Sequence, residues 1–441
     1  HYTYDHGGRL TQTTHSLNSG AERILAQNEY DELGYLRKKS YPGNLDAATY
    51  GYNVRGWIDQ INSTHYRQAI YYGFWQNKSK SCYNGNPAGA SYSTTYRDPV
   101  TGGLAQTGEQ LIEYEYDGEI LKMMSSGSIE DGQFEYDSDI GESCPSIYDA
   151  ILRFYKGQSE DLMLLSSQGY GIDNICEYGA NNVASLPIQF MSKYPDATPT
   201  FFYDANGNLY KDLNRGITGI DYNLLNLPEK ITFENSSNIR YRYDADGTKL
   251  RADYKTVFNE LYTPIGLPVQ TSSGTLTVEH HIDYCDNLIY EDNVLKKIRV
   301  DGGYINYNPS TNNGEYCYYI TDQIGSNRVI LSETRGVIQH VGYYPYGIPF
   351  SEIPIEEDNF LHAGKELEKM HGLYWYDNGK RWYDPILARF TTMDPLCEKY
   401  YDKNPYSYCA DNPMRYGDVN GDSIWFTFDK DVITMHVTGK V

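Results

Sequence analysis

The sequence predicts an all-β fold built as an array of β-hairpins, and two observations carry this prediction. The first is a recurring word in which Tyr is followed by Asp or Asn and then by a turn residue, Gly or Asn. Copies begin at Tyr4, Tyr30, Tyr52, Tyr203, Tyr222 and Tyr243, at intervals of 26 and 22 residues in the first group and 19 and 21 in the second. The second observation is composition, with 46 Tyr, 40 Gly and 15% aromatic residues in 441. Regular spacing of this kind indicates a repeat array.

Each repeat is expected to be one hairpin. About twenty residues hold two strands of roughly five or six residues and two turns. Tyr suits the strand end, Asp or Asn opens the turn, and Gly or Asn supplies the positive φ. We therefore expect one continuous antiparallel sheet in which Tyr4, Tyr30, Tyr203 and Tyr243 occupy equivalent positions.

The repeats vary along the chain. They are clear in residues 1 to about 75, degenerate from about 76 to 200, and clear again from 201 to 248. Ile147 to Leu165 is the main candidate for a helix, and Pro and Gly crowd between 372 and 421, which is typical of a terminal cap. The predicted divisions are a repeat shell (1–355), a core (356–422) and a linker or start of a further C-terminal domain (423–441).

Composition limits the partners. The formal net charge is −22 with a pI near 4.8, which argues against nucleic acid or an anionic membrane as the main partner and leaves open a basic cargo. No apolar run has the length of a membrane span.

The 7 Cys contain no Cys-x-x-Cys pair, and the His spacings match no metal motif, so no cofactor or metal is predicted. The chain begins with His1 inside a repeat, so we expect it to be a piece of a longer polypeptide.

The end of the chain carries a specific set of words in a fixed order. They are Gly364-Lys365-Glu366, Gly372-Leu373-Tyr374-Trp375-Tyr376, Arg381-Trp382-Tyr383-Asp384-Pro385 with Ala388-Arg389-Phe390, Met393-Asp394-Pro395-Leu396, Asn404-Pro405-Tyr406-Ser407-Tyr408, and Asp418-Val419-Asn420-Gly421. Together they resemble the RHS repeat-associated core of the Rhs/YD-repeat family. That family includes bacterial polymorphic toxins, the C components of insecticidal toxin complexes and, more distantly, teneurins.

The resemblance implies an architecture and a function. The architecture is a β-sheet spiralling into a hollow shell, with the core as a C-terminal plug. The function is an encapsulating shell of a secreted polymorphic toxin, whose partners are the C-terminal toxin cargo of the same polypeptide and a secretion or delivery machinery. The alternative is a teneurin-like cell-surface recognition module that binds carbohydrate or protein. A weaker third interpretation, a protease acting on other proteins, lacks any sign of a substrate cleft.

The resemblance also implies that the core is a self-cleaving aspartyl protease. Asp394 and Asp418 match its two motif aspartates, and Arg389 is expected to orient or charge-balance them, with a cut near Asp422-Ser423. Two carboxylates held close together share a proton, so one can act as general acid while the other activates water. Val in place of Pro and the extra carboxylate of Asp422 depart from the family pattern and oppose activity. The alternative is that both aspartates only form turns.

A calcium loop is a competing interpretation of the same stretch. Asp418, Asn420, Asp422 and Asp429 have the spacing of calcium ligands. Ser423 stands where the loop needs Gly, and the residues after Asp429 read as a strand instead of a helix. We therefore interpret the spacing as chance. Residues 423–441 contain no catalytic constellation that would identify a toxin activity.

Overall fold

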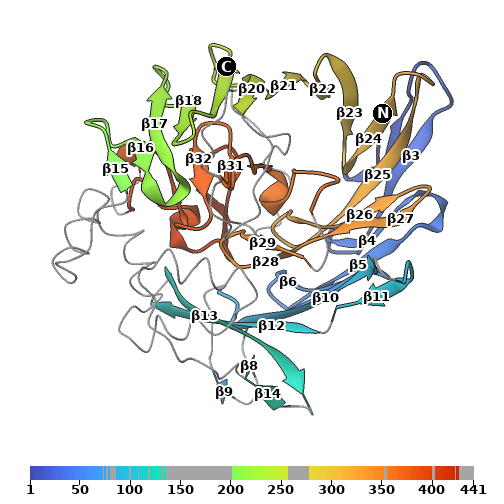
Figure 1. Cartoon of the computed structure of the whole chain (residues 1–441). Coiled ribbons are helices and arrows are strands. Elements are labelled where there is room, and N and C mark those ends of the chain that lie inside the picture. The colour runs from blue at the N-terminus through green and yellow to red at the C-terminus, as the bar shows by residue number, and fades with distance from the viewer. Residues whose placement is uncertain are drawn as a thin grey trace.

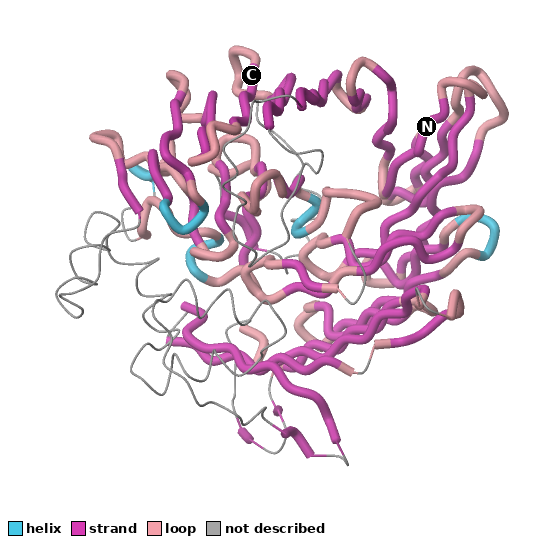
Figure 2. Tube along the Cα trace, in the orientation of Figure 1, coloured by secondary structure: helices cyan, strands magenta, loops and turns pink. Residues whose placement is uncertain are grey.

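The computed structural model describes residues 1–72, 86–98, 101–107, 109–117, 120–130, 201–256, 278–351, 355–399 and 403–422, together with the short strands 74–75, 78–79, 133–135 and 424–426. The helix expected at Ile147 to Leu165 and most of the expected C-terminal linker lie outside these residues. The described chain is all-β, as predicted, with a few 3-10 turns (Figure 2). Among the described residues, no helix has the length and apolarity needed to cross a bilayer.

Two large antiparallel sheets, each in sequence order, form most of the structure (Figure 1). The 12-stranded sheet contains β1 (Tyr2–Tyr4), β2 (Leu10–His15), β3 (Arg23–Tyr30), β4 (Leu36–Ser40), β5 (Ala47–Tyr52), β6 (Ile58–Asn62), β7 (Tyr66–Tyr71), β10 (Gly89–Arg97), β11 (Leu104–Gln106), β12 (Gln110–Asp117), β13 (Ile120–Glu130) and β14 (Gln133–Glu135). The 13-stranded sheet contains β15 (Phe201–Tyr203), β16 (Leu209–Asp212), β17 (Ile217–Tyr222), β18 (Pro228–Phe233), β19 (Asn238–Tyr243), β20 (Lys249–Thr256), β21 (Val278–Cys285), β22 (Leu288–Glu291), β23 (Val294–Val300), β24 (Gly303–Asn308), β25 (Asn313–Thr321), β26 (Asn327–Ser332) and β27 (Gly336–His340). The described strands form these two sheets, and the one continuous sheet expected from the repeats stays a prediction, because residues 136–200 between them lie outside the description.

Smaller elements complete the chain. The two-stranded sheets are β8 (Phe74–Trp75) with β9 (Lys78–Ser79), β28 (Gly342–Tyr343) with β29 (Pro349–Phe350), and β34 (Tyr416–Asp418) with β35 (Ile424–Phe426). A four-stranded sheet contains β30 (Glu366–Glu368), β31 (Trp375–Asp377), β32 (Trp382–Asp384) and β33 (Arg389–Phe390). The 3-10 turns are η1 (Pro42–Asn44), η3 (Leu213–Arg215), η4 (His362–Gly364), η5 (Cys397–Lys399) and η6 (Cys409–Asp411).

The repeat tyrosines occupy equivalent positions, as predicted. Each sits at a β-bulge and pairs with the residue six positions later, as Tyr30 does with Leu36 and Tyr243 with Lys249. In each turn one carboxylate or amide oxygen accepts two backbone N–H groups. Asp31 Oδ1, for example, accepts from Leu33 and Tyr35 at 2.9 Å each. The turn then needs a positive φ, which Gly34 supplies at 88°.

In six hairpins the tyrosine hydroxyl forms a hydrogen bond to the hairpin before it, a role that the sequence pattern did not reveal. Each hydroxyl donates to the backbone carbonyl of the first residue of the preceding return strand. The bonds run from Tyr30 to Leu10 (2.9 Å), Tyr52 to Leu36 (3.0 Å), Tyr72 to Ile58 (3.1 Å), Tyr222 to Leu209 (2.5 Å), Tyr243 to Pro228 (3.0 Å) and Tyr343 to Asn327 (2.7 Å). Tyr72 and Tyr343 therefore belong to the same series as the repeats found by sequence.

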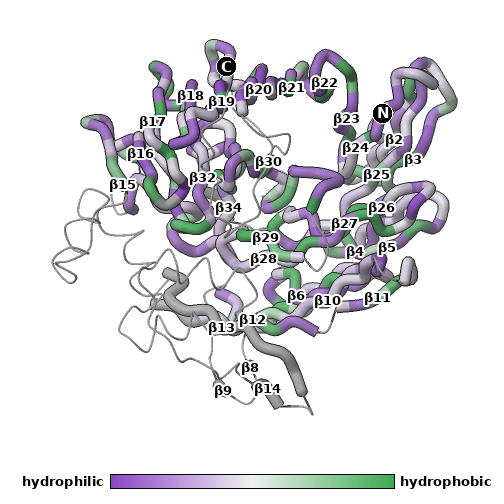
Figure 3. Tube along the Cα trace, in the orientation of Figure 1, coloured by the Kyte–Doolittle hydropathy of each residue, from purple (hydrophilic) through white to green (hydrophobic). Residues whose placement is uncertain are grey.

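The two large sheets pack against each other, so the chain returns over its own beginning. Strands β25 to β27 lie beside the early strands at the right of Figure 1. The Tyr41 hydroxyl donates to the carbonyl of Tyr319 at 2.7 Å, and Arg23 forms an ion pair with Glu333 at 2.9 Å. Apolar and polar residues alternate repeatedly along the tube (Figure 3), as expected for sheets with one covered face.

Residues 356–422, which we call the plug, lie inside the curve of the two sheets (Figure 1). Successive residues of a strand point to opposite faces. Trp375 and Trp382 pack into the core of the second sheet, whereas Tyr376 and Tyr383 pack into the core shared with the first. All four side chains are at most 1% exposed. The plug is therefore a packed layer between two hydrophobic cores.

Candidate functional site

The candidate site lies where the chain leaves the plug, in the turn after β34. Asp418 Oδ1 accepts the backbone N–H of Gly421 at 2.6 Å. Gly421 has a φ of 85°, and a Cβ there would lie 2.9 Å from the backbone nitrogen of Arg381. A side chain at position 421 would both strain the backbone and displace its neighbour, so the close approach of this turn to Arg381 requires glycine.

Arg381 connects the two predicted aspartates. Its Nη2 lies 2.9 Å from Asp394 Oδ2 and 3.6 Å from Asp418 Oδ2. The same guanidinium donates through Nη1 to the carbonyl of Pro405 at 3.0 Å and through Nε to the carbonyl of Gly421. Arg381 is 2% exposed, so these contacts form away from bulk water. Asp394 and Asp418, which lie 24 positions apart in the sequence, thus meet on one buried cation.

The surroundings of Asp394 raise the pKa of its carboxyl group. Burial raises the pKa of Asp394, and the nearby carboxylate of Asp422 raises it further. The Arg381 charge and the backbone N–H of Leu396 act in the opposite direction. Burial also lowers the pKa of Arg381, an effect that the surrounding carboxylates oppose. The arrangement places two carboxyl groups on one guanidinium, and Asp394 also accepts the Leu396 N–H at 2.7 Å, as a turn former does.

Arg389 lies elsewhere. Its guanidinium carbon lies 5.2 Å from the ring centre of Tyr203 and 4.8 Å from that of Tyr406. It is 3% exposed, and its Nη1 and Nη2 atoms have no hydrogen-bond partner within the part of the chain that the structure describes. Its charge acts on Asp411, whose pKa burial raises to about 7 against the lowering effects of Lys403 and Arg389. The ion pairs with Asp394 and Asp418 are thus made by Arg381, a residue that sequence reasoning did not select although it stands in the same set of words.

A second cluster fixes the plug to the shell. Lys249 of β20 forms ion pairs with Glu366 at 2.7 Å and Asp377 at 2.9 Å, and its side chain is 8% exposed. The hydroxyl of Tyr284 donates to Glu366 at 2.8 Å. Arg215 makes a comparable buried link, to Asp384 of the plug at 2.9 Å. These partners are more than 80 residues apart in sequence, and no local signal connects them.

The remaining predicted features are the cut near Asp422-Ser423 and the calcium spacing. Ser423 and Asp429 lie outside the described residues, so the geometry of the expected cut and of the full calcium spacing is not described. Among described residues, no group of three or more His, Cys, Asp or Glu is arranged to hold a metal ion. His362 is buried with a pKa lowered by burial to about 3, and its ring nitrogens lie 3.2 Å from the hydroxyls of Ser326 and Tyr408.

Solved structures with a similar fold come from Tc toxin complexes. The crystal structure of TcdB2-TccC3-Cdc42 has a TM-score of 0.57 at 16% identity, and covers 95% of this chain and 20% of its own. TcdB2-TccC3 without its hypervariable C-terminal region has a TM-score of 0.55 at 16% identity, with the same coverage. A Photorhabdus luminescens Tc holotoxin pore with a mutated TccC3 has a TM-score of 0.56 at 16% identity, and covers 97% of this chain and 20% of its own. The chain therefore has an Rhs-like shell fold.

The sequence comparison gives a different relative. Salivary gland surface protein 1 of Aedes aegypti is 27% identical over 229 residues, which are 50% of this chain and 6% of that protein. No protein-family model matches the chain. The chain thus spans about a fifth of the structural relatives and a small part of this curated relative.

Proposed function

We propose that this chain is part of the encapsulating shell of a secreted Rhs-type toxin and that it holds a C-terminal effector of the same polypeptide. The observation that carries the proposal is the seating of the plug, which lies inside the curve of both sheets and buries aromatic residues on both of its faces. We expect a packed layer of this kind to close one end of a compartment. The compartment itself would be bounded by the strands beyond this layer.

The structural relatives supply a second argument. One of them is described as lacking its hypervariable C-terminal region, and variability at that end is what we expect of a cargo that follows a constant plug. We propose the same order here, with a variable effector after residue 422 and a delivery machinery outside the shell. The site of action is then outside the producing cell, in the secreted or cell-surface space.

Protease protection tests this proposal. In the complete polypeptide, the segment after the plug should resist added trypsin, whereas the same segment expressed alone should be degraded. The substitution Lys249→Met, which removes the cation between plug and shell, should increase the cleavage of the downstream segment. Equal degradation of the enclosed and isolated segments would exclude containment.

We also propose a self-cleavage role for Asp394 and Asp418, with Arg381 as the residue that holds them together. Support comes from the shared contacts of Arg381 and from the raised pKa of Asp394. Asp394→Asn should leave the chain folded and uncut, because the amide keeps the shape and loses the proton. Asp246→Asn, in an exposed hairpin turn, is the control. An uncut wild-type chain on a gel would exclude self-cleavage, and both aspartates would then have only the turn-forming role.

The second candidate function is recognition at a cell surface. One observation favours it: the curated relative with 27% identity is described as a surface protein. A recognition module binds through its outer face and needs no cargo. An intact cell-surface protein that leaves no protected fragment after trypsin treatment would support this function over containment.

A further inference from the structure

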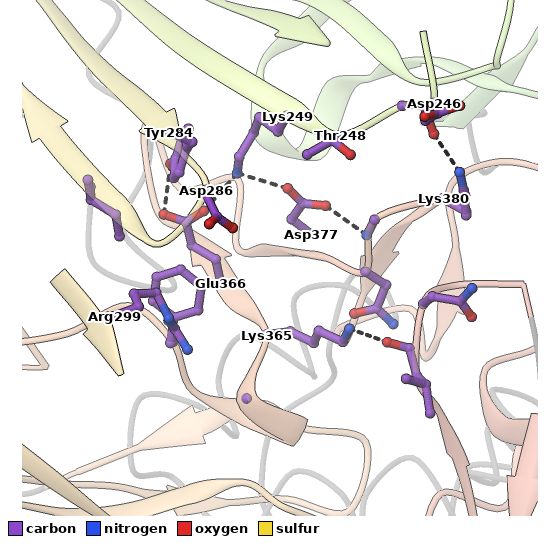
Figure 4. Close-up of a pocket in the computed structure, with 18 residues that line it drawn as sticks. Asp246, Thr248, Lys249, Tyr284, Asp286, Arg299, Lys365, Glu366, Asp377 and Lys380 are labelled. Carbon is purple, nitrogen blue, oxygen red and sulfur yellow. Dashed lines mark hydrogen bonds and ion pairs between the residues drawn. The ribbon is translucent and has the colours of Figure 1, made fainter. Parts of the chain in front are cut away.

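A cavity of about 420 Å³ lies at the junction of plug and shell (Figure 4), and Val419 and Asn420 of the turn after β34 form part of its lining. Its walls come from the hairpin turns at 246–249 and 286–289 of the second sheet and from residues 364–366 and 377–380 of the plug. Pockets that hold small molecules have volumes of about 300–1,000 Å³. The space is therefore large enough for a ligand with the size of a monosaccharide.

The wall of this cavity contains an amide that the protein leaves unsatisfied. Asn378 is 1% exposed, and neither its Nδ2 nor its Oδ1 has a hydrogen-bond partner within the described chain. A buried polar group without a partner costs about 1–3 kcal/mol, and most such groups in proteins are paired. The amide offers a hydrogen-bond donor and an acceptor in the lining of the cavity. A ligand hydroxyl can pair with it, because a hydroxyl also donates and accepts.

The cavity also contains three cationic side chains besides Lys249. Arg299, Lys365 and Lys380 line it and form no ion pair with a described residue. Within the described residues, Lys365 and Lys380 donate to backbone carbonyls, those of Val419 and Asp246. Arg299 lies with its guanidinium carbon 3.4 Å from the ring centre of Phe360, and its Nη1 has no hydrogen-bond partner among the residues that the structure describes. This stack holds the guanidinium in place for an anion.

The acidic residues of the cavity separate into two kinds. Glu366 and Asp377 are already neutralised by Lys249. Asp246 and Asp286 are exposed at the rim and can accept hydrogen bonds from hydroxyl groups. A ligand with several oxyanions would meet these carboxylates unfavourably, whereas a ligand with one carboxylate and several hydroxyls would satisfy both the cations and the acids.

We infer that this cavity binds an acidic monosaccharide unit, with its carboxylate near Arg299 and Lys365 and its hydroxyls near Asn378 and the rim aspartates. The inference does not depend on containment or self-cleavage, because it uses none of the residues assigned to them except the neutralised pair at Lys249. A sugar at this position contacts plug and shell together. Its binding would therefore stabilise their junction.

Calorimetric titration of the 441-residue chain with D-glucuronate, D-glucose and inorganic phosphate tests the inference. We expect saturable binding of glucuronate at least 10-fold tighter than that of glucose or phosphate. Equal binding of glucose would show that the cations do not contribute, and equal binding of phosphate would show that the sugar does not. No saturable binding of glucuronate would also overturn the inference.

Substitutions locate the binding. Arg299→Gln should weaken glucuronate binding at least 10-fold, and Lys296→Gln, which removes an exposed charge from the same strand β23, should leave it within 2-fold. Because Arg299 packs on Phe360, its variant could lose structure. Lys380→Gln, at an exposed position of the cavity, is the second variant and should weaken binding several-fold with an unchanged circular dichroism spectrum. Equal effects of Lys296→Gln and Lys380→Gln would refute the site.

Discussion

Removing the hydroxyl of Tyr243 should destabilise the protein more than removing the hydroxyl of Tyr30. Both donate to the carbonyl of the preceding hairpin, at 3.0 Å for Tyr243 and 2.9 Å for Tyr30. The Tyr243 hydroxyl also accepts the indole N–H of Trp382 at 3.2 Å, and Trp382 is 1% exposed. Tyr243 thus belongs both to the repeat series and to the plug junction, whereas the contacts described for Tyr30 are with Leu10 and Arg9 of the neighbouring hairpin.

The magnitudes follow from these partners. A typical hydrogen bond contributes about 0.5–1.5 kcal/mol, so Tyr30→Phe should reduce the free energy of unfolding by about 1 kcal/mol. Tyr243→Phe leaves two groups unpaired, the Pro228 carbonyl and the buried Trp382 N–H. An unsatisfied buried group costs about 1–3 kcal/mol, so we expect a total loss of about 2–4 kcal/mol.

Urea unfolding followed by tryptophan fluorescence measures both values, with a far-ultraviolet circular dichroism trace to check that the transition is cooperative. Tyr2→Phe, at an edge strand where the side chain is 58% exposed, is the control and should change stability by less than about 0.5 kcal/mol. Equal losses for Tyr30→Phe and Tyr243→Phe would refute the reasoning, because they would show that the bond to Trp382 contributes nothing.

Three further outcomes follow from the buried charges and the exit turn. Lys249→Met should cost about 3–5 kcal/mol of unfolding free energy, because it leaves the carboxylates of Glu366 and Asp377 without their cation. Lys255→Met, which removes an exposed ion pair, should cost less than about 1 kcal/mol. Equal losses for the two variants in urea unfolding would contradict this expectation. Asp411 has a folded pKa of about 7, above its unfolded value, so its contribution to stability is complete below about pH 4 and is lost as the pH rises to 7. In denaturation curves measured across this range, Asp411→Asn should remove up to about 4 kcal/mol of the decline in unfolding free energy. An unchanged pH profile in the variant would show that Asp411 does not cause the decline. Gly421→Ala should move the turn away from Arg381 and increase trypsin cleavage after residue 422, and a cleavage rate equal to that of the wild type would show that the turn tolerates a Cβ.

The local part of the fold could be predicted from the sequence because its causes are local. Asp or Asn, two spacer residues and Gly specify a turn whose hydrogen bonds stay within five residues, as in Asp31 to Tyr35. The tyrosine hydroxyl bonds reach about 13 to 20 residues back, to a carbonyl that any residue type provides. Nothing in the sequence marks that acceptor, and the link therefore emerged only from the structure.

The candidate site could be predicted in part. Asp394 and Asp418 were selected by resemblance, and the structure brings both to one guanidinium. The resemblance selected Arg389, whereas the structure places Arg381 between the two aspartates. Ala388 has a φ of 55°, and this left-handed residue immediately precedes Arg389. A backbone reversal of this kind changes which face a side chain occupies, and a motif comparison does not contain that information.

The position of the plug between two cores sets an order of events during synthesis. Each hairpin can close as soon as its two strands have been made, because its contacts are local. Trp382 follows its partner Tyr243 by 139 residues, which at roughly 5–20 residues per second is a delay of about 7–28 s. During that interval the inner faces of both sheets have no cover, and their aromatic residues are available to any other chain. A partly synthesised shell is therefore most prone to aggregation before the plug has been made. The risk falls once the plug has packed against both sheets.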